Sequence, residues 1–224
     1  MAPYSGLTGQ STPASLGKFT GVSKLIPTEL KSACTTLAVA LINAFARDSD
    51  ISSNAISFGI RAIPNEEKEI EIFFYDTAQG GAGYSTQMGS MWYKLLDMAI
   101  KELQQCSCDS RCYNCLSSYN NRFKDSLLNR YLAISLGEFL KTGEIKLDAD
   151  ATLKSALTKS LHLELEALGA KLVDEKYIQL DAKLIEISWI PSLKKKSPAV
   201  AEYQLTPFDL INHLAGIIND IRSR

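Results

Sequence analysis

The sequence predicts an α+β fold that is mostly helical with a small sheet. Apolar residues recur at three- and four-residue spacing in several long stretches, which is typical of helices that bury one face. Two short runs, residues 55–62 and 69–76, are instead rich in β-branched and aromatic residues, and the turn signal Pro64-Asn65 lies between them. We therefore expect a pair of strands packed among helices.

The composition is that of an ordinary globular protein. Of the 224 residues, 46% are hydrophobic and 22% are charged, and the net charge is −1. This balance allows a packed core without disulfides, and it excludes a uniformly basic nucleic-acid binder, so any such role needs a local patch. Residues 1–17 lack the apolar run of a signal peptide, and the longest apolar stretch, residues 37–46, is too short to span a bilayer. We expect a cytoplasmic protein without membrane contact.

The first two thirds of the chain contain most of the expected elements. Residues 1–27 are rich in Ser, Thr, Gly and Pro and are expected to form an N-terminal arm. A helix is expected from Thr28, its N-cap, and a long helix should follow the second strand after a glycine-rich turn. After a cysteine-rich loop, a further helix is predicted over about residues 124–141. We assign residues 28–141 to one domain.

The last third is expected to form an accessory α/β segment, residues 142–224, of unknown role. We expect residues 143–150 to form the boundary between the two parts. A helix over about residues 151–168 and two strands within about 176–190 should follow. A basic loop, Lys194-Lys195-Lys196, then precedes a final amphipathic helix.

Four cysteines fall within ten residues, in the pattern Cys106-x-Cys108-x3-Cys112-x2-Cys115. Short Cys-x-Cys and Cys-x2-Cys pairs can together supply the four thiolate corners of a tetrahedral zinc site, and such a closed site is structural. An iron–sulfur cluster is the alternative, although no Cys-Pro signature accompanies the set. The odd, tightly clustered cysteine count argues against a disulfide framework. The fifth cysteine, Cys34, lies on an apolar helical stripe and is expected in the core.

A glycine-rich turn joins the second strand to the following helix. It comprises Asp76, Gly80, Gly81 and Gly83. Backbone N–H groups at such a turn can bind an anion, or the turn simply lets the helix pack back on the strand. Asp76 can act as a helix cap or as a general base, and the lack of a second carboxylate favours the cap. No Gly-Lys-Ser/Thr follows, so this is not a Walker A loop.

Several short motifs occur together in a fixed order. They are Tyr75-Asp76-Thr77, Gly80-Gly81-x-Gly83-Tyr84, the cysteine loop ending in Cys112-Tyr113-x-Cys115-Leu116, and Tyr119-x-Asn121 before a helix containing Arg130. This order resembles the MZB domain, the zinc-binding domain at the C-terminus of Mrf-type DExH-box helicases. The domain also occurs in helicase-associated subunits of DISARM-type anti-phage defence systems. The resemblance covers roughly residues 28–141, and it implies zinc ligation by the four clustered cysteines. The chain departs from the family at Gln79, Lys124 and Asn129.

Walker A and DExH motifs are missing, whereas the motor precedes this domain in the resembled helicases. We expect a separate subunit or a piece of a longer protein. The resemblance implies a non-catalytic zinc module that works with a helicase or ATPase motor, in DNA repair or anti-phage defence. Four basic residues are candidates for binding single-stranded DNA, with Tyr113 and Tyr119 as stacking faces: Arg111, Arg122, Lys124 and Arg130.

Three alternatives stay open at this point. The basic residues can be a solvated face that only offsets the thiolate charge. The chain can be a protein–protein adaptor, which the apolar final helix would favour. A nuclease that uses Asp76 is the third alternative, although no second acid with a neighbouring lysine is evident.

Overall fold

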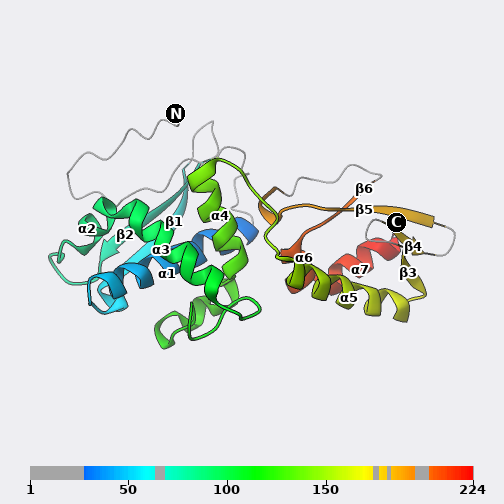
Figure 1. Cartoon of the computed structure of the whole chain (residues 1–224), viewed down its shortest axis with the longest axis horizontal. Coiled ribbons are helices and arrows are strands. Elements are labelled where there is room, and N and C mark those ends of the chain that lie inside the picture. Colours follow the sequence, from blue (N-terminus) through cyan, green and yellow to red (C-terminus); the bar gives the residue numbers. More distant parts are fainter. Residues whose placement is uncertain (1–27, 64–68, 174–176, 181–182, 195–201, 224) are drawn as a thin grey trace. The chain divides into compact units, whose positions relative to one another are not determined.

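The computed structural model describes residues 28–63, 69–173, 177–180, 183–194 and 202–223 (Figure 1). They divide into two compact units, the first ending at Gly143 and the second beginning at Glu144. Helices outweigh strands and both sheets are small, which confirms the predicted α+β class. The predicted arm at 1–27, the turn at Pro64-Asn65 and most of the basic loop at 194–196 lie outside the described residues.

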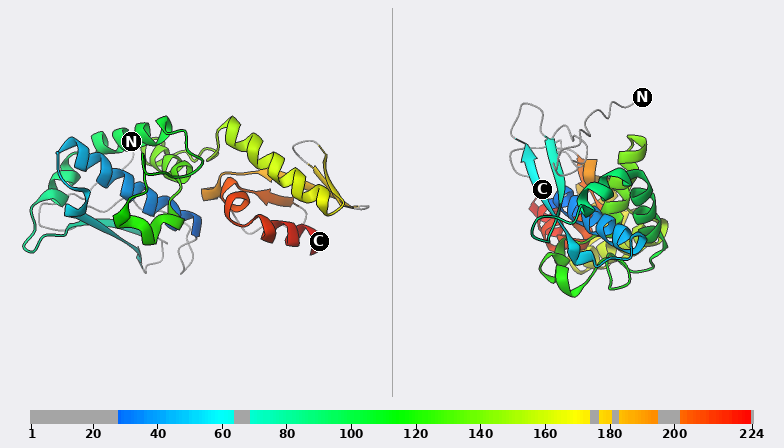
Figure 2. Two further views of the ribbon diagram at one scale, coloured as in Figure 1. Left: turned by 90° about the horizontal axis from the view of Figure 1, so that it is seen from below. Right: turned by 90° about the vertical axis from the view of Figure 1, so that its left-hand side faces the viewer.

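The first unit is built around helix α1 (Thr28–Asp48). This helix is buried almost continuously from Ser32 to Phe45, because α3 (Trp92–Gln105), α4 (Arg130–Thr142) and the hairpin all pack against it. Figure 2 shows the blue helix between the green helices and the cyan strands. A helix that is apolar around most of its circumference belongs inside a domain. The largest fully buried side chains of this core include Leu37, Leu41, Phe45, Leu95, Leu96, Leu103 and Leu132.

The first sheet is a two-stranded antiparallel hairpin, as the sequence predicts. Strand β1 (Ile56–Ile63) pairs with β2 (Glu69–Asp76), and Ile56 lies opposite Asp76. The short 3₁₀ helix η1 (Ser53–Ala55) precedes it. Ile70, Ile72 and Phe74 are buried at every second position of β2, so one face of the hairpin contributes to the core.

Two predicted helices differ from the structure in their bounds. The long helix after the glycine turn is divided at Met91 into α2 (Tyr84–Ser90) and α3. The helix predicted from residue 124 begins only at Arg130, because Asn129 is extended and its side chain accepts hydrogen bonds from the backbone of Tyr131 and Leu132. The preceding residues form the 3₁₀ helix η2 (Tyr119–Leu127) instead.

The second unit packs helices against a four-stranded sheet. Its helices are α5 (Ala151–Ala167), α6 (Pro207–Asn212) and α7 (Leu214–Ser223), with a short η3 (Ser192–Lys194). The strands lie in the order β3 (Ala170–Val173), β4 (Tyr177–Leu180), β5 (Lys183–Trp189), β6 (Glu202–Leu205), and only the β5–β6 pair is parallel. The two predicted strands are β4 and β5, whereas β3 and β6 were not predicted. The predicted final helix is divided at His213.

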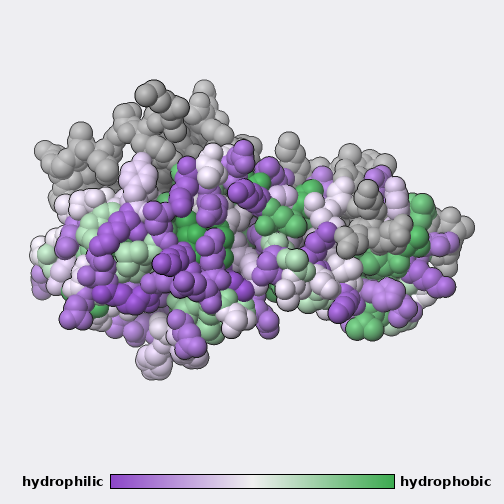
Figure 3. Space-filling model, in the orientation of Figure 1, coloured by the Kyte–Doolittle hydropathy of each residue, from purple (hydrophilic) through white to green (hydrophobic). Residues whose placement is uncertain are grey.

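The surface of the first unit is largely hydrophilic on the face shown in Figure 3, where apolar residues form only small patches. This agrees with a core in which the apolar side chains are buried around α1. Among the residues that the structure describes, no helix has both the length and the apolar character needed to cross a membrane.

Candidate metal centre

The four clustered cysteines converge at the end of α3. Cys106 directly follows this helix in an extended conformation, and the next three cysteines come from the loop between α3 and η2. The Sγ–Sγ distances are 3.4 Å for Cys106–Cys108, 3.5 Å for Cys106–Cys112, 3.7 Å for Cys108–Cys115 and 3.6 Å for Cys112–Cys115. A tetrahedral ion with Zn–S bonds of about 2.3 Å requires Sγ–Sγ distances of about 3.8 Å. The donor set therefore fits zinc.

The thiol acidities show what metal binding requires. The backbone hydrogen bond of Cys108 is the main factor that lowers the pKa of Cys106 to about 7. Desolvation raises the pKa of Cys108 to about 11 and also raises that of Cys115. Only thiolates bind the metal, so zinc must displace protons from the more buried cysteines when it binds. Four thiolates fill the coordination sphere, which leaves no open position for catalysis.

Polar contacts hold the cysteine loop in place around the donor set. Cys112 O accepts hydrogen bonds from the backbone N–H groups of residues 115, 116 and 117. Arg111 Nε donates to Asp125 at 2.7 Å, and the Ser117 hydroxyl donates to the other oxygen of the same carboxylate at 2.7 Å. Hydrogen bonds from Ser117 and Arg111 hold the pKa of Asp125 below its usual range. The charge of Arg111 is therefore mainly neutralised by Asp125 within the protein.

Arg130 requires a correction to the predicted DNA-contact residues. Its side chain is only 6% exposed, and its guanidinium donates to Cys108 O at 2.8 Å, Leu103 O at 3.1 Å and Tyr131 Oη at 2.6 Å. These acceptors lie at the C-terminal end of α3 and inside the cysteine loop, where free carbonyls need partners. Arg130 is thus an internal anchor of the metal site. Its spacing to the cysteines did not reveal this, because burial depends on how α4 packs.

Helix α1 also contacts the cysteine loop and the segment that follows it. The Thr36 hydroxyl accepts a hydrogen bond from the Asn129 backbone at 2.9 Å, and Asn43 Nδ2 donates to Cys115 O at 3.4 Å. The Ser32 hydroxyl donates to Leu127 O at 2.5 Å. The central helix is therefore bonded to the metal loop at Cys115 and to the segment that links η2 to α4 at Leu127 and Asn129.

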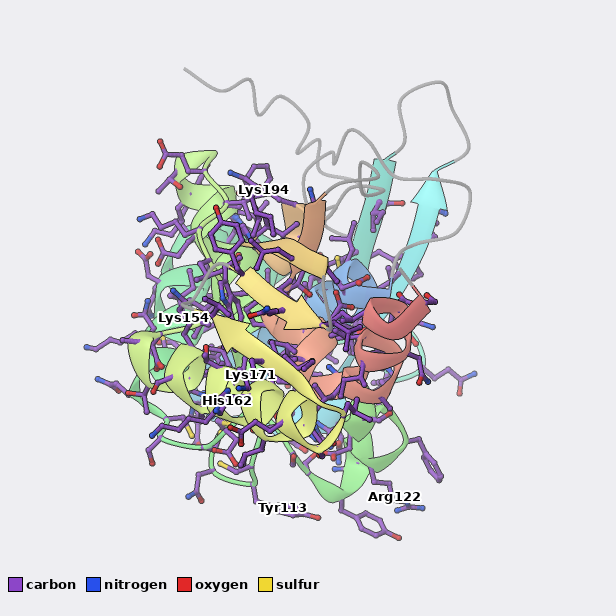
Figure 4. All side chains as sticks on the ribbon, turned by 90° about the vertical axis from the view of Figure 1, so that its right-hand side faces the viewer. Tyr113, Arg122, Lys154, His162, Lys171 and Lys194 are labelled. Carbon is purple, nitrogen blue, oxygen red and sulfur yellow. The ribbon has the colours of Figure 1, made fainter. Side chains whose placement is uncertain are left out.

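The remaining two predicted basic residues are exposed. Lys124 places Nζ 4.1 Å from the centre of the Phe58 ring, and Arg122 places Cζ 4.1 Å from the centre of the Tyr119 ring. Arg111, Tyr113 and Arg122 line one open depression of about 830 Å³ beside the metal loop. Figure 4 shows Tyr113 and Arg122 projecting from the same end of the first unit. The structure thus brings Arg122 and Tyr113 to one surface.

The same surface contains an aromatic residue that the sequence reasoning missed. Phe123 is 84% exposed, and the centre of its ring lies 4.6 Å from Arg122 Cζ. A signal existed, because this phenylalanine stands in the polar run Tyr-Asn-Asn-Arg-Phe-Lys with no helical stripe to bury it. An aromatic ring in such a run is expected at the surface.

The glycine turn is organised by a single carboxylate. Asp76 accepts hydrogen bonds from the backbone N–H groups of residues 82, 83, 84 and 85, at 2.6, 2.5, 3.2 and 2.7 Å. Desolvation raises its pKa, but the hydrogen bonds from Ser85, Gly83 and Ala82 outweigh this and hold the pKa below its usual range. Gly80, Gly81 and Gly83 all have positive φ, which this turn requires. The carboxylate fills the anion position of the turn, so this geometry favours the cap over a general base.

Comparisons with known proteins agree with this geometry. Residues 37–116 match the family described as the MrfA Zn-binding domain, MZB. The Druantia protein DruE of Escherichia coli (strain UMEA 4076-1) is 29% identical over 178 residues, which is 77% of this chain and 9% of that protein. The crystal structure of the DUF1998 helicase MrfA bound to DNA is similar over 53% of this chain and 15% of that chain, with 15% identity and a TM-score of 0.40.

The family match confirms both the resemblance and the metal. The family is zinc-binding, and the four cysteine Sγ atoms lie within 4.8 Å of one another, close enough to bind one ion. The chain spans about a tenth of the length of the curated relative that it matches. Residues 37–116 are thus similar to the MZB domain, the zinc-binding domain of the MrfA type.

Proposed function

We propose that this chain is a non-catalytic zinc module that works with a helicase motor in the cytoplasm, in DNA repair or anti-phage defence, and that contacts DNA beside the metal loop. The observation that carries the DNA contact is the placement of Arg122 and Lys124 on the exposed edge of the zinc-bound segment. The names of the similar proteins, a helicase bound to DNA and a Druantia protein, support the association with a motor.

The structure reduces the number of basic residues that can contact phosphate. Arg130 is buried and Arg111 is paired with Asp125, whereas neither Arg122 nor Lys124 forms an ion pair within the described part of the chain. Each phosphate contact on a single strand contributes about 0.7 to the slope of log affinity against log salt. Two contacts therefore predict a slope of about 1.4, which is half of what four contacts would produce.

The test is single-stranded DNA binding at a series of salt concentrations. Replacing Arg122 and Lys124 together by Ala should weaken binding and nearly abolish the salt dependence, because both free cations are lost. The matched control is Arg47→Ala with Lys141→Ala, which changes the net charge equally but removes cations already paired with Glu102 and Asp97. The control should bind like the wild type.

The outcome also separates the alternatives. If the wild type binds no DNA at low salt, the surface is not a DNA contact and the adaptor hypothesis becomes the better one. Equal binding by the Arg122/Lys124 variant and the wild type at every salt concentration would show that these cations only form a solvated face. The nuclease hypothesis has lost its main support, because both oxygens of Asp76 accept backbone hydrogen bonds.

A further inference from the structure

The zinc loop and η2 expose three aromatic side chains that do not pack into the core. Tyr113 is 82% exposed, Tyr119 is 73% exposed and Phe123 is 84% exposed. Single exposed aromatic residues are ordinary, but these three lie within eleven positions of one another on the zinc loop and η2. Such a cluster on a hydrophilic surface indicates a contact with something apolar and flat.

Arg122 joins two of these rings into one surface. Its guanidinium carbon lies 4.1 Å from the centre of the Tyr119 ring and 4.6 Å from the centre of the Phe123 ring. A planar guanidinium is attracted to aromatic faces and can itself stack on a flat ligand. We call Tyr119, Arg122 and Phe123 the stacking surface. Tyr113 and Arg122 line the same depression, so Tyr113 extends the stacking surface toward the metal loop.

The backbone that carries the stacking surface is held by several hydrogen bonds. The Ser118 backbone donates to Asn121 Oδ1 at 2.8 Å, and Asn121 Nδ2 donates to Leu116 O at 2.7 Å, which fixes the start of η2. Asp125 holds the other end of the same turn through Arg111 and Ser117. The metal fixes the loop that supplies Arg111 and Ser117. A protein segment held in this way loses little conformational entropy when a ligand binds.

The charge of the segment identifies the kind of contact. Over residues 106–130, four basic side chains are balanced by two aspartates and by the net −2 of a zinc ion with four thiolates, so the segment is close to neutral. Long-range attraction to phosphate is therefore weak. Affinity for nucleic acid must come mostly from stacking, which each base can provide through its π face. In a duplex those faces are already covered by neighbouring bases.

We infer that the stacking surface of Tyr119, Arg122 and Phe123 binds the unpaired bases of a nucleic-acid single strand, with Tyr113 as a further contact. This inference rests on the proposed function, because it names the form of DNA that the same surface takes. It predicts selectivity for exposed bases, whereas the two free cations alone would bind any phosphate backbone. A proline-rich peptide fits less well, since a proline ring has no π face to lie on the guanidinium.

The experiment measures fluorescence anisotropy with the whole chain and three labelled probes. They are oligothymidylate of about 15 nucleotides, an abasic strand of the same length and charge, and the corresponding duplex. The wild type should bind oligothymidylate at least about tenfold more tightly than the abasic strand or the duplex, because stacking contributes about tenfold for each base.

The variants separate stacking from charge. Tyr119→Leu with Phe123→Leu keeps the net charge and should lower the affinity for oligothymidylate to that for the abasic strand, with zinc content unchanged. Arg122→Lys keeps the charge but removes the plane, so it should weaken oligothymidylate binding and leave abasic binding unaltered. Tyr93→Leu is the matched control, because Tyr93 is a 69% exposed tyrosine on α3.

Each other outcome overturns the inference. Equal affinity of the wild type for the abasic strand and oligothymidylate would leave the proposed DNA contact standing but remove the role of the rings. An unchanged affinity in the double leucine variant would do the same. No binding to any nucleic acid would overturn both proposals. Binding of a proline-rich peptide in place of DNA, if lost in the double variant, would assign the surface to a protein partner.

Discussion

The cysteine loop and the glycine turn are two irregular connections in the same domain, and they are stabilised in different ways. The glycine turn spans few residues, and one carboxylate, Asp76, satisfies four backbone N–H groups. The cysteine loop and η2 span residues 106–129, and their buried apolar side chains are Leu116 and Leu128. A segment of this length with so little apolar burial cannot offset its conformational entropy by packing.

The difference explains why only one of the connections needs a metal. A short turn brings its donors to one acceptor because positive-φ glycines allow a tight path. A long loop needs a centre that bonds several residues at once, and zinc bonds four. Arg130 and Asp125 then extend this centre to α3, α4 and η2. The comparison predicts that perturbing the metal centre costs more than perturbing the carboxylate.

The largest effect is expected for Cys112→Ser. Purified wild-type protein should contain about one zinc per chain, and the variant should lose most of it, because three thiolates no longer close the site. Zinc binding is coupled to folding, so the first unit should unfold at a markedly lower temperature. Metal analysis and thermal unfolding measure both effects.

The matched control is Cys34→Ala, which removes a cysteine that is buried in α1. This variant should keep its zinc and lose only a small amount of stability through the missing sulfur atom. If Cys112→Ser kept full zinc and an unchanged melting temperature, the loop would be held by its hydrogen bonds alone, and the comparison would fail.

A smaller effect is expected for Arg130→Met, which tests the extension of the metal centre into the helices. Met keeps much of the volume but leaves Cys108 O and Leu103 O without their donor. Buried acceptors left unpaired should reduce the free energy of unfolding by about 2 to 3 kcal/mol. Urea denaturation measures the loss, and zinc affinity should fall with it.

The control for this variant uses an arginine on the surface. Arg122→Met removes the same group from an exposed position and should change the free energy of unfolding by less than about 0.5 kcal/mol. Similar losses for the two variants would contradict the assignment of Arg130 as an internal anchor.

The smallest effect is expected for Asp76→Ala, which removes the centre of the glycine turn. Loss of a capping carboxylate should lower the free energy of unfolding at neutral pH by about 1 to 2 kcal/mol, with zinc content unchanged. Because the folded-state pKa of Asp76 is depressed, its contribution is complete above the unfolded-state pKa of about 3.9 and is lost as pH falls through the folded-state pKa.

The sign of this pH dependence supplies the measurement. Wild type and variant should differ most near neutral pH and converge in acid, as urea denaturation at several pH values would show. Asp76→Asn should lose less stability than Asp76→Ala, because its amide oxygen still accepts backbone hydrogen bonds, but it should show no pH dependence from this position, because the amide does not ionise. A constant difference across the acid range would mean that the turn does not depend on the ionised carboxylate.

The sequence by itself determined the zinc donors, the first hairpin and most of the helices. Cysteine spacing is a local property. Four thiols within ten residues are close enough along the chain to bind one ion together. Strand composition and helical periodicity are also local, so residues 55–62 and 69–76 were recognised. Strands β3 and β6 were not predicted, because each is a run of only four residues that stands apart from other strand signals, whereas the equally short β4 is close in sequence to β5.

Only the tertiary structure decided the roles of the charged and aromatic residues around those donors. Arg111, Arg122, Lys124 and Arg130 look equivalent in the sequence, yet one is paired, two are exposed and one is buried. Likewise, Phe123 is exposed beside Arg122, whereas Phe45 lies in the core. Burial and pairing depend on which distant elements pack together, here α1, α3 and α4, and local sequence does not encode those contacts.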